Sequence, residues 1–340
     1  MKKLLPVLPP ILFSLLLAIW SGWSRIGWSL PLTEAAGQHG NLMVNSFLAS
    51  LIFLERAVTF RQKWVLLLPL VNAVSGIAFA TGHTLVAQWL QVAGSAGFLW
   101  MCGYFLWRHR EWYYGVFGMG AACLLGGNLQ LLRTGSFTSA VGPWMAFLLL
   151  TIVAERIELS KFLPVSGRAR AVLLAALLLV VAALLLPPGT AATFVLAAGL
   201  FSTGAWLLRH DMARKALRAP GQHRYSAVVL LTGFAWLIGT AILLVFEKNI
   251  LLGYDAVLHA FFIGFVLSMI FSHAPIILPA ISHLPVKIFH PVMYAWFGLL
   301  QATLVLRICG DLLGAPGLRR WAGLGNGLVL LLFFATVAAI

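Results

Sequence analysis

Residues 254–273 read YDAVLHAFFIGFVLSMIFSH, a nearly apolar run with Asp255 and His259 near its start and His273 at its end. A run of this length can cross a lipid bilayer as a helix. Ionisable side chains inside such a helix are costly and usually line a functional site. The stretch therefore predicts a transmembrane helix and directs the search for function to Asp255 and His259.

The composition of the whole 340-residue chain indicates the same class of protein. Apolar residues make up 61% of the chain and charged residues only 9%, whereas soluble domains contain about 25% charged residues. Within lipid, only helices and closed barrels satisfy the backbone, and the period-two alternation typical of a barrel is absent. We therefore expect an all-α, polytopic membrane protein with a single transmembrane domain over residues 1–340.

Apolar runs of about 18 or more residues mark twelve expected transmembrane helices. The first of them begins directly after a short basic N-terminus and is interpreted as an uncleaved helix. The twelve ranges are 5–23, 38–58, 64–82, 84–107, 112–132, 137–155, 170–187, 191–208, 225–246, 253–275, 288–308 and 320–340.

Basic residues predict how these helices are oriented. When the loops are assigned alternately to two sides, seventeen of the 23 Lys and Arg residues fall on one side and six on the other. Because cytoplasmic loops retain basic residues, we expect both termini in the cytoplasm of a bacterial cell and the chain in its inner membrane. The net charge of +14 then faces anionic lipid headgroups. No basic domain that could hold a nucleic acid is expected.

A weak internal repeat links residues 37–58 with residues 137–158. FLASLIFLER at 47–56 aligns with FLLLTIVAER at 147–156, and five of the ten positions are identical. Each copy ends in a Glu-Arg pair. For Arg56 and Arg156 we favour the interpretation that these side chains reach the cytoplasmic headgroups from the end of a membrane span.

The predicted topology sorts the histidines by depth. His39 opens the second helix, His83 lies in a turn and His259 lies one or two turns into the tenth helix, all toward the outer side. These three could share a ligand. His273 lies fourteen residues beyond His259, about 21 Å along a helix, so it belongs to an inner group. No role is assigned to His273, or to His283 and His290, which follow it.

Asp255 and His259 are four residues apart and therefore share one face of a helix. In one interpretation His259 binds a metal or haem iron while Asp255 orients its other ring nitrogen. A second histidine ligand would then come from His39, as in a bis-histidine haem, or from His39 and His83, as in a three-histidine copper site. In the other interpretation the Asp255-His259 pair is the proton or substrate site of a secondary transporter.

Two short motifs resemble the NnrS family of haem- and copper-containing membrane proteins. They are HGNLM at 39–43, which opens the second helix, and LHA at 258–260 in the tenth. The twelve-helix layout resembles, more distantly, subunit I of the haem-copper oxidases. The resemblance implies that His39 and His259 ligate haem b or another metal, copper being the second candidate. It also implies a small diatomic ligand such as nitric oxide, and a role in nitrosative stress or electron transfer.

Two other functions are kept as alternatives. One is a proton-coupled secondary transporter built on Asp255 and His259, and the other is an accessory subunit of a membrane respiratory complex. Oxygen reduction by this chain alone is not expected, because no helix carries the paired histidines of a binuclear centre. No catalytic residue is assigned.

Overall fold

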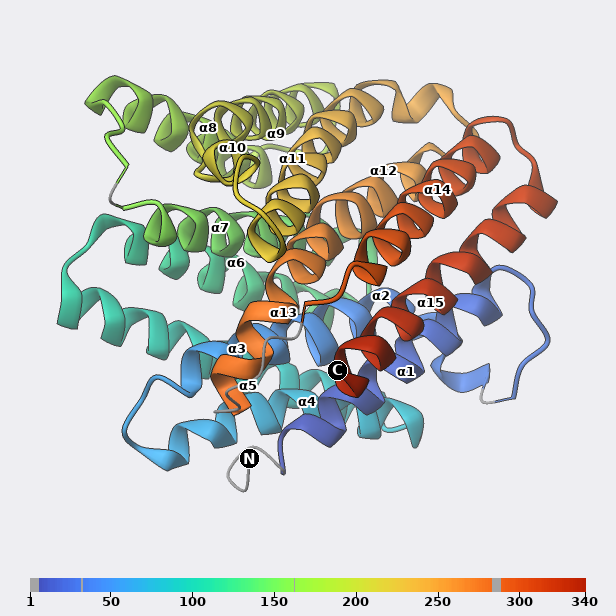
Figure 1. Ribbon diagram of the computed structural model, residues 1–340. Helices are drawn as coiled ribbons and strands as arrows, with labels where there is room; N and C mark the ends of the chain where they lie inside the picture. Colours follow the sequence, from blue (N-terminus) through green and yellow to red (C-terminus); the bar gives the residue numbers. More distant parts are fainter. Residues whose placement is uncertain (1–5, 32, 162, 283–288) are drawn as a thin grey trace. The chain divides into compact units, whose positions relative to one another are not determined.

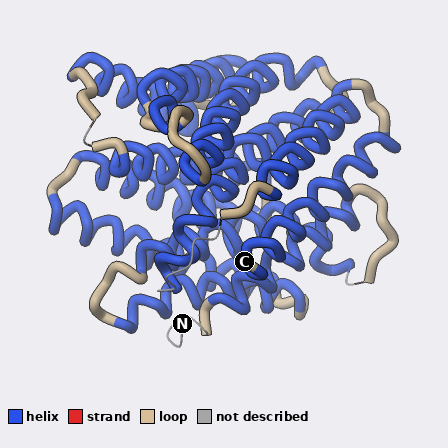
Figure 2. The backbone as a smooth tube through the Cα atoms, viewed as in Figure 1, coloured by secondary structure: helices blue, strands red, loops and turns tan. Residues whose placement is uncertain are grey.

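The computed structural model describes residues 6–31, 33–161, 163–282 and 289–340. Within these ranges every regular element is a helix and none is a strand (Figures 1 and 2). The predicted all-α fold class is confirmed. Among the described residues, ten helical segments are long and apolar enough to cross a membrane, which indicates a multi-pass membrane protein.

The ten segments agree with the last ten ranges expected from the apolar runs. They are Lys63–Ala80 (η3 and α4), Thr84–His109 (α5), Trp112–Thr134 (α6), Phe137–Leu159 (α7), Gly167–Leu185 (α8), Thr190–His210 (α9), Gln222–Asn249 (α11 and η4), Gly253–Ile276 (α12, η5 and most of α13), Val292–Leu312 (α14) and Pro316–Ala339 (α15).

The first two expected spans are also helical, but they do not share the length and hydropathy of the ten. The first is α1 (Leu8–Arg25), and the second joins α2 (His39–Asn41), the π-helix η2 (Leu42–Ala49) and α3 (Ser50–Ala57) without a break. Buried polar side chains, among them Asn41, Asn45 and Ser46, explain the lower hydropathy of the second. The count of twelve spans and the side on which the termini lie stay predictions.

The chain divides into two compact units. Unit 1 consists of Met1–Ala154 with Ala280–Leu284, and unit 2 of Glu155–Pro279 with Pro285–Ile340. Unit 1 therefore holds α1 to α6 and most of α7. Unit 2 holds the end of α7 and nearly all of the helices that follow.

In unit 1, α1 packs against α4 (Leu67–Ala80) and η2, and α5 packs against both α4 and α6. Glycines allow these helices to approach closely. A Cβ atom added to Gly76 of α4 would collide with Ser14 of α1, and one added to Gly94 of α5 would lie 2.6 Å from the side-chain oxygen of Asn72 on α4. Polar side chains thus lie directly at the helix contacts of unit 1.

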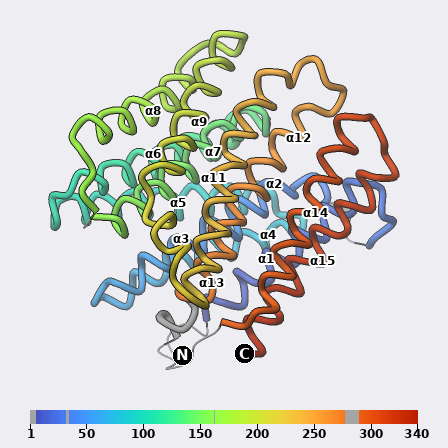
Figure 3. Tube along the Cα trace, turned by 45° about the horizontal axis from the view of Figure 1, so that its top comes forward, coloured from blue at the N-terminus to red at the C-terminus, as the bar shows by residue number. Residues whose placement is uncertain are grey.

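In unit 2, the packed pairs are α8 with α9, α9 with α11 (Gln222–Phe246), α11 with the π-helix η5 (Ala260–Leu267), and α14 with α15. Figures 1 and 3 both show α14 and α15 side by side. A Cβ atom at Gly199 would lie 3.0 Å from the backbone of α8, and one at Gly310 would lie 2.8 Å from the backbone nitrogen of Arg319 on α15. These helices therefore meet at the backbone.

Two π-helices of eight residues each begin shortly after a histidine. η2 starts three residues after His39, and η5 follows directly on α12 (Gly253–His259). π-Helices are rare and frequently occur at functional sites. The two positions emphasised by the sequence thus share an uncommon backbone geometry.

The helices of the predicted repeat have a third counterpart in sequence. In both copies a phenylalanine is followed five residues later by an isoleucine, at Phe47 and Ile52 and at Phe147 and Ile152. The same spacing recurs at Phe265 in η5 and Ile270 in α13 (Ser268–Ser282). All three phenylalanines are buried. His273 stands where the first two copies carry Glu55 and Glu155. The duplication itself stays a prediction.

Gly310 and Gly298 lie on the same helix, α14, and provide a matched test of the packing. Gly310→Ala should lower the free energy of unfolding by about 1–3 kcal/mol, because its Cβ would press on the backbone of α15. Gly298→Ala should raise it by up to about 1 kcal/mol, because nothing lies within 4 Å of that Cβ and alanine favours a helix. Unfolding in detergent measures both. Equal effects would contradict the described contact.

Candidate functional site

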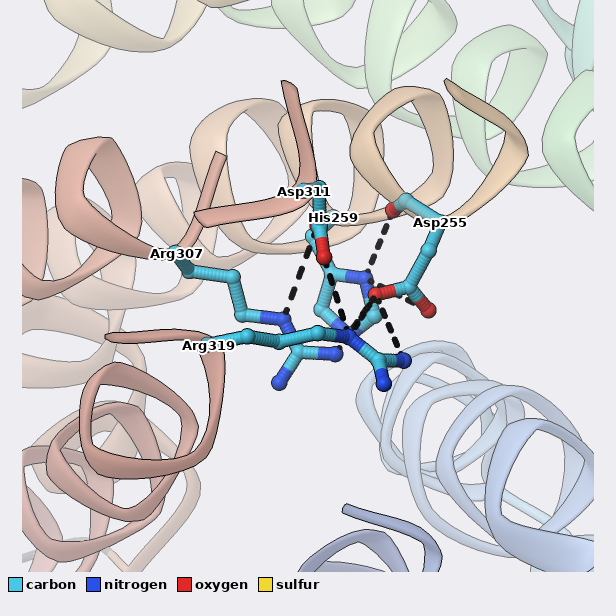
Figure 4. Close-up of polar contacts among 5 residues, drawn as sticks. All are labelled: Asp255, His259, Arg307, Asp311 and Arg319. Carbon is cyan, nitrogen blue, oxygen red and sulfur yellow. Dashed lines mark hydrogen bonds and ion pairs between the residues drawn. The ribbon is translucent and has the colours of Figure 1, made fainter. Parts of the chain in front are cut away.

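Five charged or titratable side chains of unit 2 form one group, here called the Asp255 cluster (Figure 4). α12 contributes Asp255 and His259, α14 contributes Arg307 and Asp311, and α15 contributes Arg319. Within α12 and α14 the two members are four residues apart, so each helix presents both on one face. The turn between α14 and α15, where Gly314 has a φ of 62°, brings Arg319 back to the end of α14.

The cluster is built from ion pairs. Oδ2 of Asp255 lies 2.7 Å from Nη2 of Arg307 and 3.2 Å from Nη2 of Arg319. Nε of Arg319 lies 2.9 Å from Oδ1 of Asp311. Two guanidinium groups thus face two carboxylates, and this compensation of charge is what allows such groups to be buried.

Exposure differs strongly across the cluster. The side chain of Asp311 is fully buried and that of Arg307 is 6% exposed, whereas Asp255 and Arg319 are 24% and 25% exposed. The cluster therefore has a closed side around Asp311 and an open side at Asp255 and Arg319. A ligand from outside would meet Asp255 and Arg319 first.

His259 is oriented by the backbone of the same helix. Its Nδ1 lies 2.8 Å from the carbonyl oxygen of Asp255 and 3.6 Å from the carboxylate of that residue. Because a carbonyl oxygen can only accept a hydrogen bond, Nδ1 carries the hydrogen, and a neutral ring then has its lone pair on Nε2. The ring is thus held by the carbonyl of Asp255, while the carboxylate binds the two arginines.

His39, in unit 1, is oriented in the same way. Its Nδ1 donates to the carbonyl oxygen of Ala18 on α1 at 2.7 Å, which again places the lone pair of the neutral ring on Nε2. The ring lies against Gly22, where an added Cβ atom would come within 2.7 Å of Cε1. α1 therefore fixes both the tautomer and the position of His39.

Three histidines named from the sequence remain, His83, His283 and His290. His83 is exposed, precedes α5 and has Nδ1 3.1 Å from Oγ1 of Thr81. His290 is also exposed, and its Nδ1 accepts a hydrogen bond of 3.2 Å from the backbone nitrogen of Val292. His283 lies outside the described residues. Within the described ranges, no group of three or more His, Cys, Asp or Glu side chains is suited to hold a metal ion.

A second buried group, the Arg156 cluster, was not expected from the sequence. Nε and Nη2 of Arg156 donate to the two carboxylate oxygens of Asp211 at 2.8 and 2.7 Å, and Nη1 lies 3.2 Å from Nε2 of His273. Arg156 is 4% exposed. The prediction that this side chain reaches the lipid headgroups is therefore wrong.

The chemistry of the Arg156 cluster fixes the state of His273. A guanidinium group has only donors, so Nε2 of His273 must accept the hydrogen bond and the imidazole is neutral in this arrangement. Asp211 also accepts from the backbone nitrogen of Ala213 at 2.7 Å. Asp211 is the residue that could have indicated this cluster from the sequence. It is one of only nine acidic residues and directly follows α9.

Arg156→Gln should lower the free energy of unfolding by about 3 kcal/mol, because it leaves the buried carboxylate of Asp211 without its cation. Arg214→Gln is the matched control. Arg214 is exposed, and its replacement should change stability by less than about 0.5 kcal/mol. Unfolding of both variants in the same detergent checks the difference, and a small effect at Arg156 would contradict a buried ion pair.

Comparison with known proteins adds a family but no activity. No curated protein and no solved structure significantly matches the chain. Residues 4–340 match the family described as "Domain of unknown function (DUF8744)", and because this match covers nearly the whole chain, the protein belongs to that family.

Proposed function

We propose that this protein is a membrane protein that binds haem b, with His39 of unit 1 and His259 of unit 2 as its two candidate histidine ligands. One observation carries the proposal. Both imidazoles donate from Nδ1 to a backbone carbonyl, at 2.7 Å and 2.8 Å, and therefore carry the lone pair of the neutral ring on Nε2. Histidines that bind metals are usually held by such a hydrogen bond from the other ring nitrogen.

The Asp255 cluster also suits this cofactor. Haem b carries two carboxylates, and guanidinium groups form strong paired hydrogen bonds with carboxylates. Arg319 is 25% exposed and is bound to Asp255, only four residues from His259. Arg319 would thus offer a carboxylate-binding group on the open side of the cluster, beside a proposed iron ligand.

A haem ligated by histidine would supply electron transfer, or the binding of a diatomic ligand such as nitric oxide where one ligand position is open. The protein would set ligation, access and the surrounding charge. Asp255 lies beside His259 and binds Arg307 and Arg319, so this ion-paired carboxylate would contribute to the charge around the haem.

Copper is not part of the proposal, because the described residues bring together no three side chains suited to a metal. The transporter hypothesis gains no support from Asp255, whose carboxylate is bound by two arginines and is therefore a poor carrier of protons. The accessory-subunit hypothesis would be supported by a redox partner that copurifies with the protein in fixed stoichiometry.

We further propose twelve spans, with α1 and the α2–η2–α3 helix as the first two, and both termini on the cytoplasmic side of a bacterial inner membrane. The bias of basic residues supports this orientation. The polar side chains of the second helix are buried within unit 1, so its lower hydropathy is compatible with a membrane span.

The visible spectrum of the purified protein tests haem binding. The reduced-minus-oxidised spectrum should show a haem b band that is lost or strongly shifted in His39→Ala and in His259→Ala, because each variant lacks a ligand. His83→Ala and His109→Ala, both exposed, should leave the band unchanged. A colourless wild-type protein without iron would overturn the proposal. If the haem band is present, titration of the reduced protein with nitric oxide tests the diatomic ligand.

The role of Arg319 is tested by haem affinity. Arg319→Gln should weaken the binding of added haem to the apoprotein by roughly 10- to 150-fold, because a charged hydrogen bond contributes roughly 1.5–3 kcal/mol. Arg133→Gln, at the end of α6, is the control and should bind haem as the wild type does. Unchanged affinity in Arg319→Gln would remove Arg319 from the proposed site while leaving the histidine ligands untested by that measurement.

A further inference from the structure

A tract of uncharged polar side chains crosses the interior of unit 1. Its members are all buried, at 2% exposure or less, and come from the second helix, α4, α5 and α6. They are Asn41, Asn45, Ser46, Ser50, Asn72, Ser75, Gln91, Ser95 and Asn128. In a chain with 61% apolar residues, so many buried amides and hydroxyls in one place require an explanation.

Most of the tract is connected by direct hydrogen bonds. Oγ of Ser46 and Oγ of Ser75 are 2.7 Å apart, and Nε2 of Gln91 lies 3.3 Å from each of them. Asn128 donates to the Gln91 carbonyl oxygen and to Oγ of Ser95, both at 3.3 Å, and accepts from Nε1 of Trp144 at 2.9 Å. This part of the tract joins neighbouring helices, as polar side chains commonly do in membranes.

The end of the tract nearest His39 in the chain is different. Nδ2 of Asn45 donates to Oδ1 of Asn41 at 2.8 Å, and Nδ2 of Asn72 donates to the Asn45 carbonyl oxygen at 2.6 Å. Three atoms of the same amides have no partner among the described residues: Nδ2 of Asn41, Oδ1 of Asn45 and Oδ1 of Asn72. All three residues are fully buried.

Buried polar groups without a partner are rare, because leaving them unpaired costs the full penalty of removing them from water. The three atoms comprise two acceptors and one donor. A cation would suit the acceptors but oppose the amide donor, and an anion would do the reverse. A water molecule donates two hydrogen bonds and accepts others, so it can serve both kinds of group, as internal water usually does.

We propose that Asn41, Asn45 and Asn72 are internal hydration positions, at which the unpaired amide atoms bind water inside unit 1. Asn45 belongs to the π-helix η2, and the Asn72 side chain bonds its backbone carbonyl. Asn41 is two residues from His39. The inference does not depend on haem.

Solid-state NMR of the full chain in lipid bilayers tests this hydration. With ¹⁵N-labelled asparagine, transfer of magnetisation from water protons to each side-chain amide is measured. Asn128 is the matched control, because it is equally buried and its amide is fully bonded within the protein. The Asn41 amide should receive several-fold more transfer from water than the Asn128 amide. The single-residue variants Asn41→Ser and Asn128→Ser assign the two resonances.

Transfer to Asn41 that is no greater than transfer to Asn128 would overturn the internal hydration and leave the tract as a set of links between helices. If a variant does not fold, the wild-type resonances are assigned by sequential correlations. The measurement is made on protein with and without added haem. Hydration of Asn41 in a protein that binds no haem would separate this inference from the proposed function.

Discussion

The scarcity of negative charge constrains the packing of unit 2. The chain has nine acidic residues against 23 Lys and Arg, and a buried cation in apolar surroundings needs an anion beside it. Asp211 meets this need for Arg156, and Asp255 with Asp311 does so for Arg307 and Arg319. Each of these carboxylates joins different segments of the chain. The positions of three aspartates therefore decide which helices of unit 2 can lie together.

The sequence predicts the helices of this protein much better than their polar partners. Long apolar runs locate ten spans with small differences at their ends, since length and hydropathy are properties of one segment at a time. The interpretation of Arg156 failed for the opposite reason. Depth along a helix placed it near a membrane boundary, but its partner Asp211 lies 55 residues away. Nothing in a local pattern reports which face of a helix meets that residue.

The histidines show the same limit at the scale of single atoms. Asp255 and His259 could be paired from their spacing, but the carbonyl that accepts from the ring belongs to the backbone and leaves no trace in the sequence. The same holds for Ala18, which orients His39 from a different helix. Likewise, the topology treats Arg307 and Arg319 only as two of the six basic residues on the outer side, although the structure binds both to Asp255.

In the two π-helices, the exact number of residues determines on which face of the helix the flanking side chains lie. A π-helix has hydrogen bonds between residues i and i+5, so it holds more residues per turn than an α-helix. In an α-helix each residue turns the chain by about 100°. Loss of a single residue from η2 would therefore rotate everything on one side of it relative to the other. His39 and the buried Phe53 could not both keep their present faces. A one-residue deletion in a relative would thus mark a different site, even where every named side chain is retained.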